Sequence, residues 1–295
     1  MSAALRPRRS VLFMPASNAR ALEKARSLPA DGLIFDLEDA VAPDAKSAAR
    51  DGVARSLAAG SYGRREVMLR VNALTTDWGH ADLVAAASVP IDAVVLPKVE
   101  SAAAVRQAQA ILTEAGAPDH LSIWCMIETP RGVLRAEEIA SASGQVGGLI
   151  MGTADLTKDL RARHTRERLP LLTSFGHCLL AARAFGVAIL DGVHLDLADD
   201  EGFLAACHQA RELGFDGKTL IHPKTIAAAN TVFAPSSEEV AAARRIIAAH
   251  AEAVAAGKGI VLVDGRLVEN LHVQSAHRTV ALAEAIAALE HANGS

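Results

Sequence analysis

Two carboxylates, Glu128 and Asp155, follow apolar stretches that are typical of buried strands. Glu128 comes directly after S-I-W-C-M-I, and Asp155 follows L-I-M-G-T-A. Because consecutive parallel strands end at the same edge of a sheet, the two acids are expected to lie side by side, and their hard oxygen atoms suit Mg²⁺. The alternative is that each acid caps the helix that follows it, as Asp and Glu often do.

Further polar residues stand at the ends of the other apolar runs. They are Pro15, Ser17, Asp36, Glu38, Arg70, Asn72, Lys98, Asp191 and His222. Arg70 lies inside the apolar run V-M-L-R-V, so its guanidinium needs an acid such as Glu38 or Glu128, or an anionic substrate. The two interpretations are compatible. Lys98 is expected to pair with an acid such as Asp36.

A divalent cation held by two acids beside an arginine suits the polarisation of a keto or enolate oxygen and the binding of a carboxylate. This combination favours a retro-aldol or retro-Claisen cleavage, in which negative charge develops on an enolate. Hydrolysis by an activated water needs the same groups, and the residue types do not separate the two reactions. Arg70 and Glu38 are the candidate catalytic side chains among these residues.

The elements that must position these residues are eight strand-like runs, each followed by a helical segment. The runs span 10–15, 31–38, 66–72, 93–99, the two stretches that end at Glu128 and Asp155, 187–197 and 216–223. Eight such units in about 220 residues predict a TIM (β/α)8 barrel, with a doubly wound open sheet as the alternative. The absence of G-x-G-x-x-G after the first run counts against a dinucleotide-binding fold.

The last sixty residues predict an appendage to this barrel. A helix over 236–256 precedes a hairpin over 257–269, with Asp264 and Gly265 at its turn, and a final helix spans 270–291. We therefore expect a barrel domain over 1–234 and an arm over 235–295 that packs on a neighbouring subunit.

Composition narrows the classes of function. The chain has 295 residues, 51% of them hydrophobic and 22% charged, and a net charge of −4. These values are ordinary for an enzyme and give no support to nucleic-acid binding. No signal peptide or membrane span is recognisable, so a cytoplasmic protein is expected. Arg6, Arg8 and Arg9 resemble a solvated tail, and the three cysteines, Cys125, Cys178 and Cys207, are predicted to be buried and inert.

Several motifs resemble the citrate lyase β-subunit-like family of the HpcH/HpaI aldolase superfamily. They are, in chain order, R-S-V-L-F-M-P-A, G-L-I-F-D-L-E-D-A-V, V-M-L-R-V-N, V-V-L-P-K-V-E, M-I-E-T-P-R-G-V, G-F-D-G-K-T-L-I-H-P and F-A-P-S, and the similarity runs from about residue 8 to 290. The resemblance implies a TIM barrel that forms a homotrimer or homohexamer, with Mg²⁺ on Glu128 and Asp155. It also implies that Arg70 and Glu128 contact the substrate.

The same resemblance assigns further substrate contacts. Phe13, Arg20 and Lys24 would lie near coenzyme A, the two cations facing its phosphates, and Leu190 and Asp191 would line the substrate pocket. Two departures from the family stand out. Ala154 replaces an acid that many relatives carry before the metal aspartate. Glu269 takes the place of a catalytic aspartate that a neighbouring subunit supplies, and its side chain reaches one methylene further.

The combined prediction is a Mg²⁺-dependent lyase that cleaves a short 3-hydroxy-dicarboxylic acyl-CoA, such as malyl-CoA or citramalyl-CoA, to acetyl-CoA and a 2-keto acid. Glu269 would exchange the proton at the acetyl carbon. Three alternatives remain: a (3S)-malyl-CoA thioesterase with the same metal site, a 2-keto acid aldolase that does not use CoA, and a citrate lyase β-type subunit.

Overall fold

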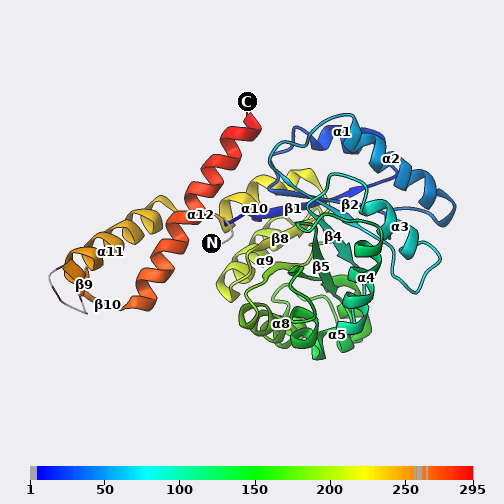
Figure 1. Cartoon of the computed structure of the whole chain (residues 1–295). Helices are drawn as coiled ribbons and strands as arrows, with labels where there is room; N and C mark the ends of the chain where they lie inside the picture. Colours follow the sequence, from blue (N-terminus) through cyan, green and yellow to red (C-terminus); the bar gives the residue numbers. More distant parts are fainter. Residues whose placement is uncertain (1–4, 256, 258–260, 264, 295) are drawn as a thin grey trace. The chain divides into compact units, whose positions relative to one another are not determined.

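The computed structural model describes residues 5–255, 257, 261–263 and 265–294. Eight parallel strands pair in chain order, and β1 also pairs with β8, which closes the sheet into a barrel (Figure 1). The strands are β1 (Ser10–Pro15), β2 (Gly32–Asp36), β3 (Glu66–Arg70), β4 (Ala93–Leu96), β5 (Ser122–Ile127), β6 (Val146–Met151), β7 (Ala188–Asp191) and β8 (Gly217–Leu220). The predicted TIM barrel is thereby confirmed, and the open sheet is excluded.

Helices connect successive strands and cover the outside of the barrel. They are α1 (Ala19–Ala25), α2 (Lys46–Ala58), α3 (Gly79–Ala86), α4 (Ala102–Glu114), α5 (Pro130–Leu134), α6 (Ala136–Ala140), α7 (Thr153–Asp159), α8 (Leu172–Ala184), α9 (Asp200–Leu213) and α10 (Ile226–Phe233), with short 3-10 turns η1 (Pro43–Ala45), η2 (Leu169–Leu171) and η3 (Pro223–Thr225). Asn18 caps α1 by accepting the backbone N–H of Ala21.

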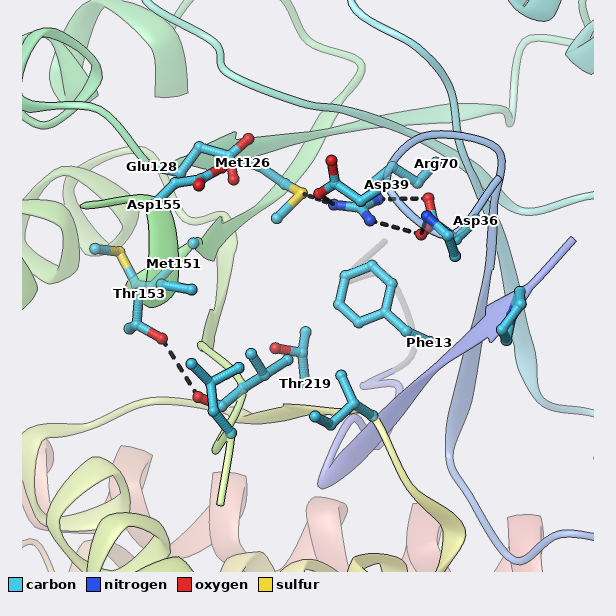
Figure 2. Close-up of a pocket in the computed structure, with 17 residues that line it drawn as sticks. Phe13, Asp36, Asp39, Arg70, Met126, Glu128, Met151, Thr153, Asp155 and Thr219 are labelled. Carbon is cyan, nitrogen blue, oxygen red and sulfur yellow. Dashed lines mark hydrogen bonds and ion pairs between the residues drawn. The ribbon is translucent and has the colours of Figure 1, made fainter. Parts of the chain in front are cut away.

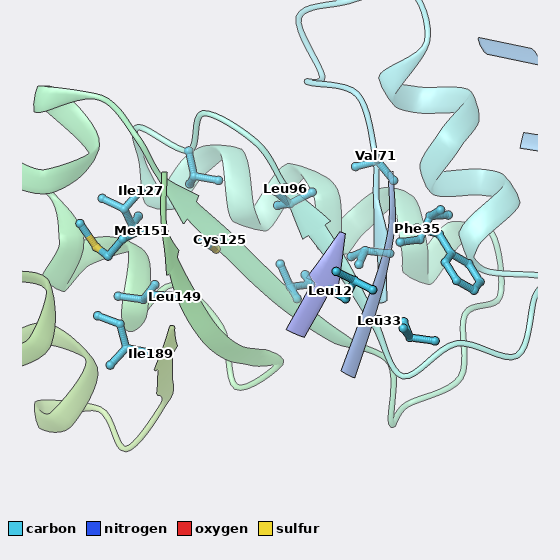
Figure 3. Close-up of a cluster of buried hydrophobic side chains, with 14 of the residues drawn as sticks. Leu12, Leu33, Phe35, Val71, Leu96, Cys125, Ile127, Leu149, Met151 and Ile189 are labelled. Atoms are coloured by element: carbon cyan, nitrogen blue, oxygen red, sulfur yellow. The ribbon is translucent and has the colours of Figure 1, made fainter. Parts of the chain in front are cut away.

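Alternate residues of each strand face two separate cores. One buried cluster consists of strand residues alone and fills the barrel; it includes Val11, Ile34, Met68, Val95, Trp124, Met126, Ile150 and Leu190. The intervening residues pack against the helices in a larger cluster (Figure 3) that includes Leu12, Leu33, Phe35, Leu96, Ile127, Leu149 and Ile189. Since a strand has a side-chain period of two, adjacent residues such as Leu12 and Val11 are buried on opposite faces.

The N-terminal end of the barrel is closed by aromatic packing and ion pairs. Trp124 is fully buried and the Arg8 guanidinium lies 5.0 Å from the centre of its ring. Arg8 also donates to Glu66 at 2.8 Å, and Arg9 donates to Asp31 at 2.8 Å. The prediction that Arg8 and Arg9 belong to a solvated tail is therefore wrong, because they bind Glu66 on β3 and Asp31 directly before β2.

Several element boundaries differ from the predicted ones. The seventh run, expected over 187–197, is a strand only over Ala188–Asp191, because the backbone N–H of the next residue, Gly192, donates to the Asp191 side chain and its carbonyl accepts from Lys218. The sixth run ends at Met151, so Asp155 lies in the first turn of α7 rather than on the strand.

The chain divides into two compact units. Residues 8–233 form the barrel, and the described residues of 1–7 and 234–295 form the other unit. In the second unit α11 (Ser237–Ala255) packs against α12 (Asn270–Gly294), and the antiparallel strands β9 (Val261–Val263) and β10 (Arg266–Val268) form a hairpin. The predicted turn residue Asp264 lies outside the described residues. No described helix has the length and hydropathy needed to span a bilayer.

We expect Gly148→Ala to destabilise the barrel. An added Cβ at this β6 position would lie 2.4 Å from the Trp124 ring, and that ring is enclosed on all sides. Such overpacking costs about 1–3 kcal/mol, which urea unfolding would measure. Gly144→Ala is the matched control, because a Cβ there meets nothing within 4 Å. Equal stability of the two variants would contradict the packing argument.

Candidate active site

A cavity of about 390 Å³ opens at the C-terminal ends of the barrel strands (Figure 2). Its lining combines charged residues with an apolar wall: Phe13, Pro15, Asp36, Asp39, Ala40, Arg70, Met126, Glu128, Met151, Gly152, Thr153, Ala154, Asp155, Val193, Leu195, Thr219 and Ile221. The two predicted metal ligands and Arg70 therefore share one pocket, although they come from β3, the end of β5 and α7.

Arg70 is held in place by its neighbour on the adjacent strand, Asp36. The two residues are register partners of β3 and β2. Arg70 donates from Nε to Oδ1 of Asp36 at 2.7 Å and from Nη2 to Oδ2 at 2.6 Å. Burial lowers the pKa of Arg70, but the hydrogen bonds and charge of Asp36 outweigh burial and raise it. The guanidinium is thus a permanent positive charge inside the barrel, and its partner is Asp36 in addition to the expected Glu38.

The carboxylate of Glu38 lies between two cations beside this pair. Its Oε2 is 2.9 Å from Nη1 of Arg70, an ion pair without hydrogen-bond geometry, and its Oε1 accepts from Nζ of Lys98 at 2.9 Å. Burial raises the pKa of Glu38, and the charges of Arg70 and Lys98 offset part of that rise. The predicted pairing of Lys98 with an acid is confirmed, but the acid is Glu38 and not Asp36.

Glu128 and Asp155 lie next to each other at the cavity (Figure 2). Glu128 is buried, and a Cβ at Gly152 would lie 2.6 Å from its Oε2, so only glycine leaves room for the carboxylate. Burial raises the pKa of Glu128 to about 7, while the backbone N–H of Lys98, which the carboxylate accepts, acts in the opposite sense. A cation at this position would stabilise the charged carboxylate.

Glu128 and Asp155 could hold a cation that completes its coordination with water or substrate oxygens. Within the part of the chain that the structure describes, no three His, Cys, Asp or Glu side chains are grouped as a metal site. Mg²⁺ differs from zinc in this respect, because it is commonly bound through one or two carboxylates and completes its octahedron with water and substrate oxygens. Glu128 and Asp155 therefore fit Mg²⁺ better than a structural metal.

Phe13 forms the wall opposite these acids. The centre of its ring is 4.9 Å from the Arg70 guanidinium, in a cation–π contact. Met126 and Met151 add apolar surface to the lining of the same cavity (Figure 2). A pocket with one charged side and one apolar side suits a short acyl group that carries a carboxylate.

The structure places other predicted residues away from this cavity. Leu190 is buried inside the barrel, and the Asp191 carboxylate accepts from Lys218 at 2.6 Å and from Arg168 at 2.7 Å; neither residue lines the pocket. Asp191 is thus neutralised by two cations at the end of β7, and its predicted contact with the substrate stays a prediction. Arg20 and Lys24 lie on α1 and are exposed, outside the pocket lining.

Glu269 belongs to the second compact unit. It is exposed, and its backbone N–H donates to Nδ1 of His272 at 3.0 Å. Its proposed catalytic role in a neighbouring subunit stays a prediction. Asp39, which sequence reasoning did not select, lines the pocket and lies 3.4 Å from Nη1 of Arg70. Its position in D-L-E-D, directly after Glu38, was the available signal.

The three cysteines provide no nucleophile at this site. All are buried, and burial raises the pKa of Cys125 and Cys178 to about 12 and that of Cys207 to about 11. Since the thiolate is the reactive form, these side chains are inert at neutral pH.

Comparison with known proteins identifies the family. The family model described as HpcH/HpaI aldolase/citrate lyase matches residues 9–223, which is the barrel. The chain belongs to this family. A (3S)-malyl-CoA thioesterase of Cereibacter sphaeroides is 49% identical over 282 residues, covering 96% of each chain. The citrate lyase subunit beta of Escherichia coli is 37% identical over 284 residues, covering 95% of this chain and 94% of that one.

A solved structure matches as well. CitE from Mycobacterium tuberculosis, crystallised in complex with magnesium, acetoacetate and coenzyme A, has a TM-score of 0.74 and 32% identity, and the match covers 93% of this chain and 97% of that one. The predicted family is confirmed, and the chain is a member of an enzyme family. The relatives include both a hydrolase and lyases, and the higher identity is to the hydrolase.

We expect Asp36→Ala to destabilise the protein by about 3 kcal/mol, because removing one partner of a buried ion pair leaves the other charge uncompensated. Arg70 would lose both of its short hydrogen bonds, and the N–H groups of Glu38 and Ala40 would lose their acceptor. Urea unfolding measures the change. Glu23→Ala is the control, since its ion pair with Arg26 is on the surface. A loss no larger than that of the control would show that Asp36 does not stabilise Arg70.

Proposed function

We propose that this protein is a Mg²⁺-dependent thioesterase that hydrolyses a short hydroxy-dicarboxylic acyl-CoA of the malyl-CoA type. The observation that carries this proposal is the 49% identity to a (3S)-malyl-CoA thioesterase over 96% of both chains, together with a pocket that groups Arg70, Glu128 and Asp155. Hydrolysis was the alternative in the sequence interpretation, and the comparisons favour it over C–C cleavage.

Mg²⁺ is proposed as the cofactor because the donor set fits it and because CitE was crystallised with magnesium. Glu128 and Asp155 would hold it. When bound, it would supply Lewis-acid polarisation of the substrate oxygens.

The side chains of the pocket would orient the substrate and neutralise its negative charge. The Arg70 guanidinium, whose direction is set by Asp36, provides positive charge beside the carbonyl or carboxylate end of the substrate. Glu38 lies against Nη1 of Arg70 and keeps that nitrogen at the pocket edge. Phe13 and Met126 pack along the acyl chain and exclude water from it. Water adds to the thioester carbonyl, the C–S bond breaks, and the thiolate of CoA leaves and takes up a proton.

A lyase is the second candidate, favoured by the match to citrate lyase subunit beta and to a CitE complex with acetoacetate and coenzyme A. In this reaction Glu269 of a neighbouring subunit would transfer the proton at the acetyl carbon. A homotrimer or homohexamer, with residues 235–295 completing the adjacent site and with Arg20 and Lys24 near the CoA phosphates, belongs to the same proposal. An acyl-CoA is the proposed substrate in both cases.

An acyl-CoA panel distinguishes the two reactions. Purified protein with MgCl₂ and each CoA ester is assayed separately for free thiol and for 2-keto acid. A thioesterase releases one thiol for each ester consumed and no keto acid. Keto acid without free thiol would establish the lyase instead. Turnover of a free keto-acid aldol in the absence of CoA would overturn both.

We expect Glu128→Gln to lower kcat/KM by at least about 100-fold, in the range found when one charge-stabilising group is removed. The amide retains the shape of the side chain but not its negative charge. Glu100→Gln is the matched control, because that glutamate is exposed and pairs with Arg131 at 3.8 Å. EDTA should abolish the wild-type activity and added Mg²⁺ should restore it. Full activity of Glu128→Gln, with unchanged circular dichroism, would rule out the metal assignment.

A further inference from the structure

Lys98 has an unusual backbone for a side chain of its size. Its φ is 49°, in the left-handed region, and it is one of three non-glycine residues with positive φ in the described part of the chain. This conformation is unfavourable for residues other than glycine and persists only where surrounding contacts hold it. Here it turns the backbone N–H of Lys98 toward Glu128, which accepts it at 2.7 Å through Oε1.

The side chain of the same residue reaches two more acids. Nζ of Lys98 donates to Oε1 of Glu38 at 2.9 Å and lies 4.0 Å from Oδ2 of Asp155. One residue therefore contacts Glu38 beyond β2 and Glu128 beyond β5, and lies within ion-pair distance of Asp155 on α7. The Lys98 side chain is 45% exposed, so its ammonium can move into solvent without breaking the packing of the barrel.

We propose that Lys98 is the positioning residue of this acid cluster: its backbone N–H orients Glu128, and its ammonium is an exchangeable counter-ion that competes with a divalent cation for Asp155. The inference rests on the proposed Mg²⁺ site. It adds that the affinity of the site is limited by a positive charge that the chain itself supplies.

The Lys98 ammonium and a divalent cation compete for Asp155 because both are positively charged. A positive charge 4.0 Å from Asp155 lowers the negative potential that attracts a divalent cation there. Because the ammonium is partly solvated, its effect is modest, and because it is already hydrogen-bonded to Glu38, it can shift away from Asp155 without losing its partner. Removal of the ammonium should therefore strengthen the binding of a cation. A substitution that merely damaged the site would weaken it.

The test is isothermal titration calorimetry of the full chain with MgCl₂ in the absence of substrate. Lys98→Met removes the charge but keeps the backbone N–H and most of the stem. Lys98→Gly also relieves the left-handed strain, and Lys98→Arg keeps a positive charge. We expect Met and Gly variants to bind Mg²⁺ about fivefold more tightly than wild type, the factor that corresponds to an exposed ion pair. The Arg variant should remain close to wild type.

Lys224→Met is the matched control, because that lysine pairs with a different acid, Asp200, at 2.8 Å; its Mg²⁺ affinity should not change. In EDTA, Lys98→Met should melt below wild type, since Glu38 loses a partner, and Mg²⁺ should raise the Tm of this variant more than that of wild type.

Unchanged or weaker Mg²⁺ affinity in both Met and Gly variants would overturn the proposal and leave the proposed function intact. Tightening in Gly alone would assign the effect to backbone strain and also overturn it. Absence of Mg²⁺ binding in wild type would overturn the metal assignment together with this inference.

Discussion

The bidentate ion pair between Arg70 and Asp36 is the interaction on which the pocket depends. An arginine inside a barrel is unstable without a partner, since burying an unpaired charge costs several kcal/mol. Asp36 solves this problem from the adjacent strand and also accepts the N–H groups of Glu38 and Ala40. It therefore fixes the guanidinium and the start of the loop after β2 together. The carboxylate that holds Arg70 thereby also brings Glu38 and Asp39 close to the guanidinium, and Asp39 lines the pocket.

The barrel could be predicted from the sequence because its evidence is local. Eight apolar runs with helical segments between them define the fold, and the residues that follow them define the mouth of the pocket; Glu128 and Asp155 were found in this way. Contacts between residues that are distant in the chain leave no local pattern in the sequence. The sequence predicts that Arg9 belongs to a polar tail, yet its side chain is buried against Asp31. The pairing of Arg70 with Asp36 follows only from the register of β2 and β3.

Strand periodicity bears on Leu190 and Asp191, two predicted substrate contacts that do not line the pocket. Adjacent residues of a strand point to opposite faces, so Leu190 and Asp191 cannot both line one cavity. Leu190 points into the barrel, and Asp191 points toward the helices, where Lys218 and Arg168 neutralise it. The alternation of side chains along a strand therefore argues, from the sequence alone, against assigning both residues to the substrate. Which of the two residues faces the barrel interior could be decided only from the folded structure, because an aspartate among apolar residues fits a pocket and a buried ion pair equally well.

Hydrolysis and C–C cleavage require the same charged groups at this pocket, so small differences around it decide between them. A tenfold preference corresponds to only 1.4 kcal/mol, about the contribution of one hydrogen bond to a charged group. Arg70, Glu128 and Asp155 would activate a carbonyl in either proposed reaction, so the outcome would depend on what reaches the reacting carbons. Ala154 lines the pocket with a methyl group beside Asp155, where the family resemblance leads us to expect an acid, so the pocket carries one negative charge less there. In the proposed thioesterase, this methyl group would leave the space next to Asp155 open to the attacking water.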